Sequence, residues 1–431
     1  MSDSQYQWPQ DWQSLPIDRV ASQITSGGTP TSGSPRYYAD HGGLPFAKTE
    51  DLTRSQTKFI EDCDLQITDA ALKESAAKIY PAGTVLVSMY GTIGLTKITV
   101  RKMAGNQALC ALIPPFACDC NYLYHHLDFI RPDWARFSGQ TTQANINGAV
   151  VRARKVPIPP RDEQRNIARV LDTLDTAIRE TEVLIAKLKL IKQGLLHDLL
   201  TRGIDKNGKL RPPRSEAPHL YKDSPLGWIP RDWDCHSFGD LADYSNGNSF
   251  DAARWAESGM PIIRIQNLNG SLAFNYYEGS VQEKWHIRPG DLLFAWSGQR
   301  GVSFGARIWG GPEGVLNQHI FKVLPNTTVV SKAFLYRLLR FRQSAIEEAA
   351  HGFKDSFLHV TRGELSSVMV AVPDDHEQHD IEERISAHEE THENEESELK
   401  KLLDLKRGLM DDLLTGRVRV TPLLEREKQQ A

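Results

Sequence analysis

The sequence predicts an α+β fold in which two α/β domains are each followed by a long helix, and the two helices pair as an antiparallel coiled coil. Three observations predict this fold. The chain carries one plan twice, short apolar runs make up the globular part of each copy, and a long heptad pattern ends each copy. We therefore expect an internal repeat with pseudo-twofold symmetry.

Composition places the chain among ordinary globular proteins. It has 431 residues, of which 40% are hydrophobic and 25% charged, enough material for about two to four domains. No apolar run approaches the roughly 20 residues that span a bilayer, and the polar start lacks the features of a signal peptide, so we expect no membrane partner and a cytoplasmic location. The five cysteines are an odd number without a C-x-x-C pair, which excludes a disulfide framework and disfavours a thiolate zinc site. We expect buried, inert thiols.

The formal net charge of -4 conceals an uneven distribution. Residues 371–431 carry 9 basic against 17 acidic side chains, whereas the rest of the chain is slightly basic. A footprint on DNA needs only a local basic face, so the overall charge does not exclude nucleic acid.

The internal repeat is recognised by matched blocks in the two halves. Matched pairs are Asp11-Trp12 with Asp232-Trp233, Asn106-Gln107 with Asn317-Gln318, Glu163-Gln164 with Glu377-Gln378, and Gly194-Leu195 with Gly408-Leu409. The offset between copies drifts through the globular parts but stays constant through the last two pairs. Loops absorb insertions and a packed helix does not, so the constant region is predicted to be helical.

Short apolar runs punctuated by Gly, Pro and Asn predict strands in both globular parts. The clearest are residues 84–87, 109–113, 261–265, 291–296 and 320–324. After Pro159-Pro160, the acidic start Arg161-Asp162-Glu163 opens a helix.

Both predicted helices carry a heptad seam. Its apolar positions are Ile167, Leu171, Leu174, Ile178, Ile185, Leu188, Leu195 and Leu199 in the first copy and Ile381, Ile385, Leu399, Leu402, Leu409 and Leu413 in the second. A long helix with one apolar stripe needs a partner, and the other copy supplies it. Gly194 and Gly408 share one phase, where glycine costs about 1 kcal/mol relative to alanine unless close backbone approach offsets it.

At this point the repeated plan resembles the specificity subunit of type I restriction-modification systems. The resemblance rests on the Glu-Gln-x-x-Ile entry at 163–167, the Gly-Leu-x-x-Asp-Leu-Leu-Thr ending at 194–201, the block at 83–94, Gly27-Gly28-Thr29-Pro30, the Thr-Thr-Gln-x-Asn-Ile block at 141–146, and Gly227-Trp228-Ile229-Pro230-x-x-Trp233. The second half departs from the pattern: Gly-x-Thr-Pro becomes Gly247-Asn248-Ser249-Phe250, and the Thr-Thr-Gln block is replaced around Gly352-Phe353-Lys354-Asp355.

The resemblance implies a non-catalytic subunit with no cofactor of its own. It implies two target recognition domains, each reading half of a bipartite, asymmetric site on double-stranded DNA, and conserved helices that dock two methyltransferase subunits. Those partners imply S-adenosylmethionine, and the ATP-dependent translocase-nuclease subunits imply ATP and Mg. The expected boundaries are 1–158 for the first recognition domain, 159–203 for the first helix, 204–226 for a linker, 227–372 for the second recognition domain, 373–416 for the second helix and 417–431 for the tail.

Catalytic motifs are weak or missing. His388-Glu389-Glu390-Thr391-His392 matches H-E-x-x-H, but the histidines occupy seam positions and no third ligand is evident, so a polar stretch of coiled coil is the better interpretation. In that setting they would make the interhelical contact pH-sensitive. No phosphate-binding Gly-x-x-x-x-Gly-Lys-Ser/Thr and no Asn-Pro-Pro-Tyr or Asp-Pro-Pro-Tyr occurs. We expect neither a catalytic site nor a metal site.

The DNA-binding candidates are side chains that pair with phosphates and base edges, or aromatics that pack beside them. They are Lys48, Arg54, Tyr90, Lys97, Arg101, Lys102, Gln140 and Gln143 in the first half, and Arg264, Gln266, Asn267, Trp296, Gln299, Arg300, Arg307 and Lys354 in the second. For each one the alternative is a solvated surface side chain. The competing function is a coiled-coil scaffold whose two adaptor domains bind only proteins.

Replacing both Leu188 and Leu402 by Asp tests the helix pair. A carboxylate placed in an apolar seam loses several kcal/mol of solvation, so the double variant is expected to melt well below the parent chain. Unchanged melting, followed by circular dichroism, would show that the two helices do not pair through this seam.

Overall fold

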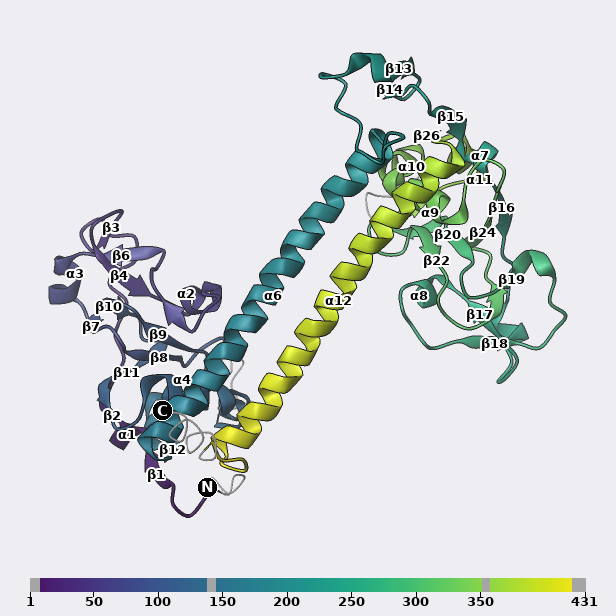
Figure 1. Cartoon of the computed structure of the whole chain (residues 1–431). Coiled ribbons are helices and arrows are strands. Elements are labelled where there is room, and N and C mark those ends of the chain that lie inside the picture. The colour runs from purple at the N-terminus through teal and green to yellow at the C-terminus, as the bar shows by residue number, and fades with distance from the viewer. Residues whose placement is uncertain (1–7, 138–144, 351–356, 421–431) are drawn as a thin grey trace, which may run out of the picture. The chain divides into compact units, whose positions relative to one another are not determined.

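The computed structural model describes residues 8–137, 145–350 and 357–420. The chain forms two compact units (Figure 1). Unit 1 comprises residues 1–184 and 395–431, and unit 2 comprises residues 185–394. Each unit therefore contains one globular part and one half of each long helix.

The globular part of unit 1 consists of two main sheets and short helices. One sheet has the order β2 (Ala21–Thr25), β11 (Leu109–Phe116), β8 (Val85–Ser88), β9 (Thr96–Thr99) and β5 (Phe59–Ile60); the other has the order β3 (Tyr38–Ala39), β6 (Leu65–Ile67), β4 (Leu44–Ala47), β10 (Met103–Gly105) and β7 (Lys78–Tyr80). A third pair joins β1 (Gln13–Pro16) to β12 (Lys155–Ile158). The helices are α1 (Ile17–Val20), α2 (Thr49–Arg54), α3 (Asp69–Glu74), α4 (Cys120–Phe129), α5 (Gly148–Ala153) and the 3-10 turn η1 (Arg131–Phe137).

The globular part of unit 2 repeats this plan. Its sheets have the orders β16 (Ala242–Asn246), β24 (Ile320–Pro325), β20 (Leu292–Ala295), β22 (Gly305–Ile308), and β18 (Asn275–Tyr277), β17 (Met260–Ile263), β23 (Gly314–Leu316), β19 (His286–Ile287). Smaller pairs are β13 (Tyr221–Ser224) with β14 (Gly227–Pro230), β15 (Asp234–Ser237) with β26 (Met369–Val372), and β21 (Ser297–Gln299) with β25 (Phe357–His359). The helices are α7 (Phe238–Leu241), α8 (Ile265–Leu268), α9 (Lys332–Phe341), α10 (Gln343–Ala349) and α11 (Arg362–Ser367), with 3-10 turns η2 (Pro218–Leu220), η3 (Ala252–Arg254) and η4 (Glu283–Trp285).

The internal repeat is therefore a repeat of topology. The order β2-β11-β8-β9 in unit 1 matches β16-β24-β20-β22 in unit 2, and β6-β4-β10-β7 matches β18-β17-β23-β19. In the second sheet of each unit, the equivalent pair of strands is parallel: β4 with β10 in unit 1, and β17 with β23 in unit 2. The predicted α+β fold is confirmed. One predicted strand is too long, because Ile265 begins α8 instead of ending β17.

Two long helices, α6 (Arg161–Thr201) and α12 (Asp375–Leu414), form the rest of the molecule. Their apolar seam positions are all buried or half-buried. In unit 1, Ile167 and Leu171 of α6 share a core with Met410 and Leu413 of α12. Asp175 of α6 forms an ion pair of 2.6 Å with Lys406 of α12. Partners of the α6 residues thus run backward along α12, so the helices are antiparallel.

Unit 2 contains the equivalent ion pair. Lys192 of α6 lies 2.7 Å from Glu389 of α12, and Lys192 and Lys406 occupy the same position of the repeat. Glu389 also pairs with Arg337 of α9 at 2.7 Å. These cations together lower the pKa of Glu389 to about 2, despite its partial burial. Both lysines are polar members of the seam, which restricts the register that the helices adopt.

A buried carboxylate at the start of each long helix organises the start of each globular part. In unit 2, Glu377 accepts hydrogen bonds from Arg211 Nη2 at 2.9 Å, Trp233 Nε1 at 3.0 Å and the Ile204 amide at 2.8 Å. In unit 1, Glu163 accepts two bonds of 2.7 Å from Arg419. We call each of these clusters a clasp.

The unit 1 clasp also explains the repeated Asp-Trp pair. Arg419 bonds both carboxylate oxygens of Asp11 and lies over the Trp12 ring, 5.7 Å from its centroid. Hydrogen bonding to Arg419 lowers the pKa of Asp11. In unit 2, Arg211 lies 3.9 Å from Asp232. In both clasps the arginine comes from the segment that follows the other long helix.

Glycine permits those segments to turn past the clasp. Gly203 and Gly416 follow the ends of α6 and α12 with φ of +62° and +74°. A Cβ on Gly203 would overlap Glu377 and Trp233, and one on Gly416 would overlap Pro9. Both positions therefore need glycine for conformation and for space.

The glutamine of each Glu-Gln pair fastens the entry of the long helix to a neighbouring helix. Gln164 accepts from the Asp119 amide at 2.6 Å and donates to Pro159 O at 2.7 Å. Gln378 accepts from the Ser331 amide at 2.9 Å and donates to Pro373 O at 3.0 Å. Asp119 and Ser331 are the N-caps of α4 and α9, so the two interactions are equivalent.

No close approach within the described part of the chain offsets the cost of Gly194 and Gly408. A Cβ built on either glycine would meet nothing within 4 Å. Both residues are exposed. The explanation for these two helical glycines is therefore not intramolecular packing.

The clasp predicts a large effect for one charge removal. Glu377→Gln leaves the buried Arg211 without its counter-ion, which costs about 3–5 kcal/mol, so the variant should melt well below the parent chain. Glu383→Gln, an exposed change on the same helix, is the matched control and should be nearly neutral. Adding Arg211→Met to Glu377→Gln should restore part of the loss. Equal stability of the Glu377 and Glu383 variants would show that the clasp does not stabilise unit 2.

Candidate nucleic-acid interface

The repeated Asn-Gln pair marks the same turn in both units. Asn106 follows β10 directly, and Asn317 follows β23. The Asn106 amide donates to Ala47 O at 3.2 Å, and the Asn317 amide donates to Ile263 O at 3.0 Å. Each turn is thus fastened to the end of the parallel neighbour strand, and we call these the Asn-Gln turns.

A basic residue stands beside each Asn-Gln turn. Lys48 follows β4, and Arg264 follows β17 at the same position of the repeat. The Lys48 amide donates to the Asp51 side chain at 2.8 Å, and the Arg264 amide donates to the Asn267 side chain at 2.9 Å. The same local hydrogen bond therefore starts α2 and α8 and fixes the backbone at both basic residues.

In unit 1 the Asn-Gln turn borders an open hollow of about 590 Å³. Its lining includes Lys48, Arg54, Tyr90, Asn106 and Ala108. Tyr90 is 45% exposed, although it is an aromatic residue. The structure therefore brings three of the predicted DNA-binding residues, Lys48, Arg54 and Tyr90, to one surface.

The Gly27-Gly28-Thr29-Pro30 block packs against the strand and the turn that form this surface. A Cβ on Gly27 would overlap the carbonyl oxygen of Gly105, so the chain passes against β10 only because this residue is glycine. Thr29 Oγ1 then donates to Gln107 Oε1 at 2.8 Å. In unit 2, Gly247 makes the equivalent close approach to Leu316 and Asn317.

In unit 2 the equivalent surface is aromatic. Trp296 Nε1 donates to Gln318 O at 3.1 Å, and its ring contacts His319 and His359 with centroid distances of 5.2 and 4.7 Å. Both histidines are exposed. Arg264 donates to Asn275 Oδ1 at 2.9 Å and lies over Trp255 at 5.2 Å. Arg264 and Trp296 thus both lie beside the Asn317-Gln318 turn.

Two predicted DNA-binding residues are used inside the fold instead. Lys97 on β9 is buried, donates to Ser55 O at 2.7 Å and also to Thr57 O, and burial lowers its pKa. Asn267 is buried and donates to Ser271 O and Ala273 O, both at 3.0 Å. Their hydrogen-bonding groups close local loops, so we leave both out of the candidate interface.

Arg54 of the hollow and the other predicted residues have various partners. Arg54 pairs with Asp51 and Asp64, Arg101 bonds Glu61 O and Asp62, Arg300 lies 3.3 Å from Glu347, and Arg307 donates to Ala306 O and Val302 O. Lys102, Gln266 and Gln299 are exposed. Gln140, Gln143 and Lys354 lie outside the described residues.

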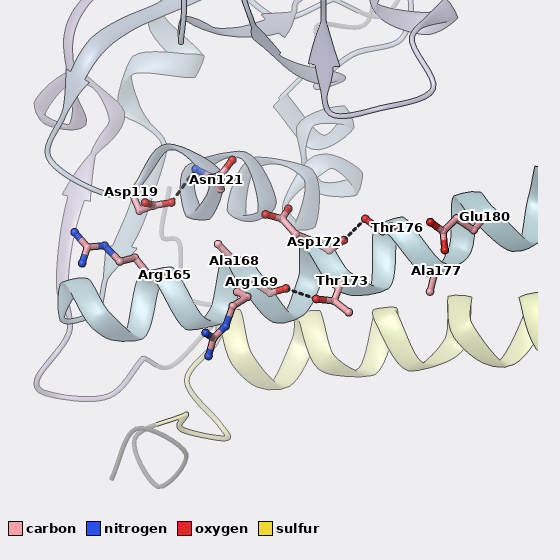
Figure 2. A pocket seen from close by; sticks show the side chains of 10 residues that line it. All are labelled: Asp119, Asn121, Arg165, Ala168, Arg169, Asp172, Thr173, Thr176, Ala177 and Glu180. Atoms are coloured by element: carbon pink, nitrogen blue, oxygen red, sulfur yellow. Dashed lines mark hydrogen bonds between the residues drawn. The ribbon is translucent and has the colours of Figure 1, made fainter. Parts of the chain in front are cut away.

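A second hollow of unit 1 lies on α6 and α4. It measures about 620 Å³, and Figure 2 shows its side chains on the first half of α6 and the start of α4. The hydroxyls of Thr173 and Thr176 donate back to helix carbonyls, at Arg169 and Asp172. These hydroxyls are therefore not poised as nucleophiles.

One group of potential metal ligands occurs among the described residues. It comprises His125, Asp172 and Asp175. Lys58 Nζ lies 2.6 Å from Asp172 and Lys406 Nζ lies 2.6 Å from Asp175, so ammonium groups already compensate both carboxylates. The donor set fits an ion-pair network that joins α4, α6 and α12. The H-E-x-x-H histidines are not in this group and lie on α12 at the seam.

The expectation of buried thiols holds for Cys63, Cys110 and Cys118, whereas Cys120 and Cys235 are half-buried. Burial raises the pKa of Cys63, Cys110 and Cys118 to about 12 and that of Cys120 to about 11, as expected for inert thiols. Within the described ranges, no helix is both long and apolar enough to traverse a bilayer.

Comparison with known proteins identifies a family on both halves of the chain. Residues 9–190 and 230–404 match the model described as the type I restriction modification DNA specificity domain. The two matched segments contain the two Asn-Gln turns and both clasp carboxylates. They cover more than half of the chain.

Individual relatives are distant in sequence. The MjaVIII specificity subunit of Methanocaldococcus jannaschii is 23% identical over 96% of this chain and 95% of its own length. The MjaIX specificity subunit of the same organism is 23% identical over 60% of this chain, and the match spans only 59% of that relative, less than two thirds. The crystal structure of the S subunit from M. genitalium shares the fold, with a TM-score of 0.56, 15% identity and coverage of 96% and 97% of the two chains.

Proposed function

This chain belongs to the family of type I restriction-modification DNA specificity subunits, and on that premise we propose that its two Asn-Gln turn surfaces each read one half of a bipartite DNA site. The observation that carries the proposal is the repetition of one surface. In each unit a basic residue, an aromatic residue and an exposed amide surround a turn that backbone hydrogen bonds hold in place. This arrangement favours DNA over the protein-only scaffold.

The chemistry of the two surfaces suits a nucleic acid. Lys48 and Arg264 supply positive charge for phosphate, and exposed amides and imidazoles supply hydrogen bonds for base edges. The surfaces differ in their side chains, since Tyr90 borders one and Trp296 with His319 and His359 borders the other. We therefore propose that the two half-sites differ in sequence and that the whole target is asymmetric.

We further propose that the long helices dock two modification subunits. In unit 2, Leu190 and Ile191 of α6 are 68% and 55% exposed; in unit 1, Leu405 of α12 is 50% exposed. Ile191 and Leu405 are equivalent in the repeat, and each lies three residues before one of the exposed glycines, Gly194 and Gly408. A partner helix that approaches closely would bury the apolar side chain and explain the helical glycine.

In this proposal the chain contributes recognition and no chemistry of its own. Methyl transfer to adenine from S-adenosylmethionine would belong to the modification subunits, and ATP- and Mg-dependent translocation and cleavage to the restriction subunits. Within the described residues, one group with metal-ligand spacing, His125, Asp172 and Asp175, has both carboxylates compensated by Lys58 and Lys406.

The function is tested by reconstitution. The purified chain alone should leave adenine unmethylated, and addition of the modification subunits encoded beside it should produce methylation at one bipartite, non-palindromic motif, read by genome-wide mapping of methylated adenines. Methylation by the chain alone, or a single continuous palindromic motif, would overturn the proposal.

Substitution of the exposed glycines separates docking from folding. Gly194→Ala and Gly408→Ala should raise helix stability by up to about 1 kcal/mol each, because alanine favours the helix. Gly194→Leu and Gly408→Leu should stabilise the helices almost as much, because leucine is also a good helix former and their surroundings are open, but should weaken binding of the modification subunits. Full binding by the double leucine variant in a titration would contradict this docking surface.

A further inference from the structure

The glutamine of each Asn-Gln turn has no role in making the turn. Asn106 fits the turn through its side chain, which accepts from the Ala108 amide at 3.1 Å. Backbone bonds complete it, with the Leu109 amide donating to Asn106 O at 3.4 Å in unit 1 and the Ile320 amide to Asn317 O at 3.2 Å in unit 2. Gln107 and Gln318 nevertheless recur at one repeat position, and both are exposed. Neither side chain bonds the backbone of its turn: Gln107 accepts from Thr29, and Gln318 lies beside His319.

Both glutamines are carried on rigid supports. The Met89 amide donates to Ala108 O at 2.8 Å, directly after Gln107, and Trp296 Nε1 donates to the carbonyl of Gln318 itself at 3.1 Å. Support of the backbone on both sides of an exposed side chain is what a precise polar contact needs.

We propose that Gln107 and Gln318 are base-reading residues, each contacting an adenine in the major groove of its own half-site; this rests on the proposed function. A carboxamide offers one acceptor and one donor in a plane, which match the N6 amino group and N7 of adenine. Lys48 and Arg264 stand beside the two turns, where they can meet the phosphates that position the duplex.

The two glutamines differ in how strongly their amides are oriented. In unit 1, Thr29 donates its hydroxyl to Gln107 Oε1 at 2.8 Å, which leaves the second lone pair of Oε1 and both Nε2 hydrogens for a base. In unit 2, the equivalent residue is Ser249, and Gln318 Nε2 instead lies 3.3 Å from His319 Nε2. The proposal therefore assigns the stricter adenine requirement to the unit 1 half-site.

The experiment selects duplexes from a randomised DNA pool with the full-length chain and compares the enriched motif between variants. Gln107→Ala should lose preference at one adenine of one half-site, by about tenfold or more, while the other half-site stays unchanged. Gln318→Ala should do the reverse. Thr29→Val should weaken preference at the same position as Gln107→Ala, but less, because it removes only the orientation of the amide.

Two outcomes would overturn the inference. One is a Gln107→Ala chain that enriches the same motif as the parent; the other is an equal loss of binding to all duplexes, which would indicate a phosphate or folding role. Gln56→Ala changes an exposed glutamine of unit 1 that does not line the hollow beside the turn; it is the matched control and should change nothing. If the parent chain enriches no motif, the proposed function fails instead, so the two failures are distinguishable.

Discussion

A buried carboxylate compensated by an arginine from a distant part of the chain is the interaction on which both units depend. Glu163 and Glu377 begin the long helices, lie in the protein interior and would be strongly unfavourable there without Arg419 and Arg211. Each clasp joins the start of one long helix to the segment that follows the other. The same contacts thus stabilise both the antiparallel pairing of the helices and the attachment of the globular parts.

The sequence predicted the periodic parts of this structure well. The heptad pattern located both long helices because burial of one helix face leaves a spacing that a single sequence displays. The repeat also predicted two equivalent domains, and their sheets share one strand order. Short, bounded apolar runs predict the strands. Ile265 is the exception: its hydrophobicity suggests a strand, but the hydrogen bond from the Arg264 amide to the Asn267 side chain starts a helix there, and hydrophobicity does not reveal that bond.

The candidate interface was only partly predictable. Side-chain type suggested Lys97 and Asn267 as DNA contacts, but their partners, such as Ser55 O, are backbone atoms brought near by folding. Conversely, Gln107 and Gln318 are visible in the sequence as a repeated pair, but the pattern does not predict them as contact residues. The available signal is that the glutamine recurs in a region where the loops differ in length between the two copies. A polar residue that is the same in both copies beside such loops indicates a role other than connecting the chain.

The division of the chain between the units has a consequence for synthesis. Unit 2 is one continuous segment, residues 185–394. All of its residues are therefore synthesised, and can make their contacts, before residues 395–431 leave the ribosome. Unit 1 needs residues from both ends, because Arg419 and Val420 pack against its first residues and the end of α12 completes its core. Its closure joins segments separated by most of the chain, the slowest kind of contact to form. Growth of the polypeptide from its amino end therefore completes the second half of the repeat before the first.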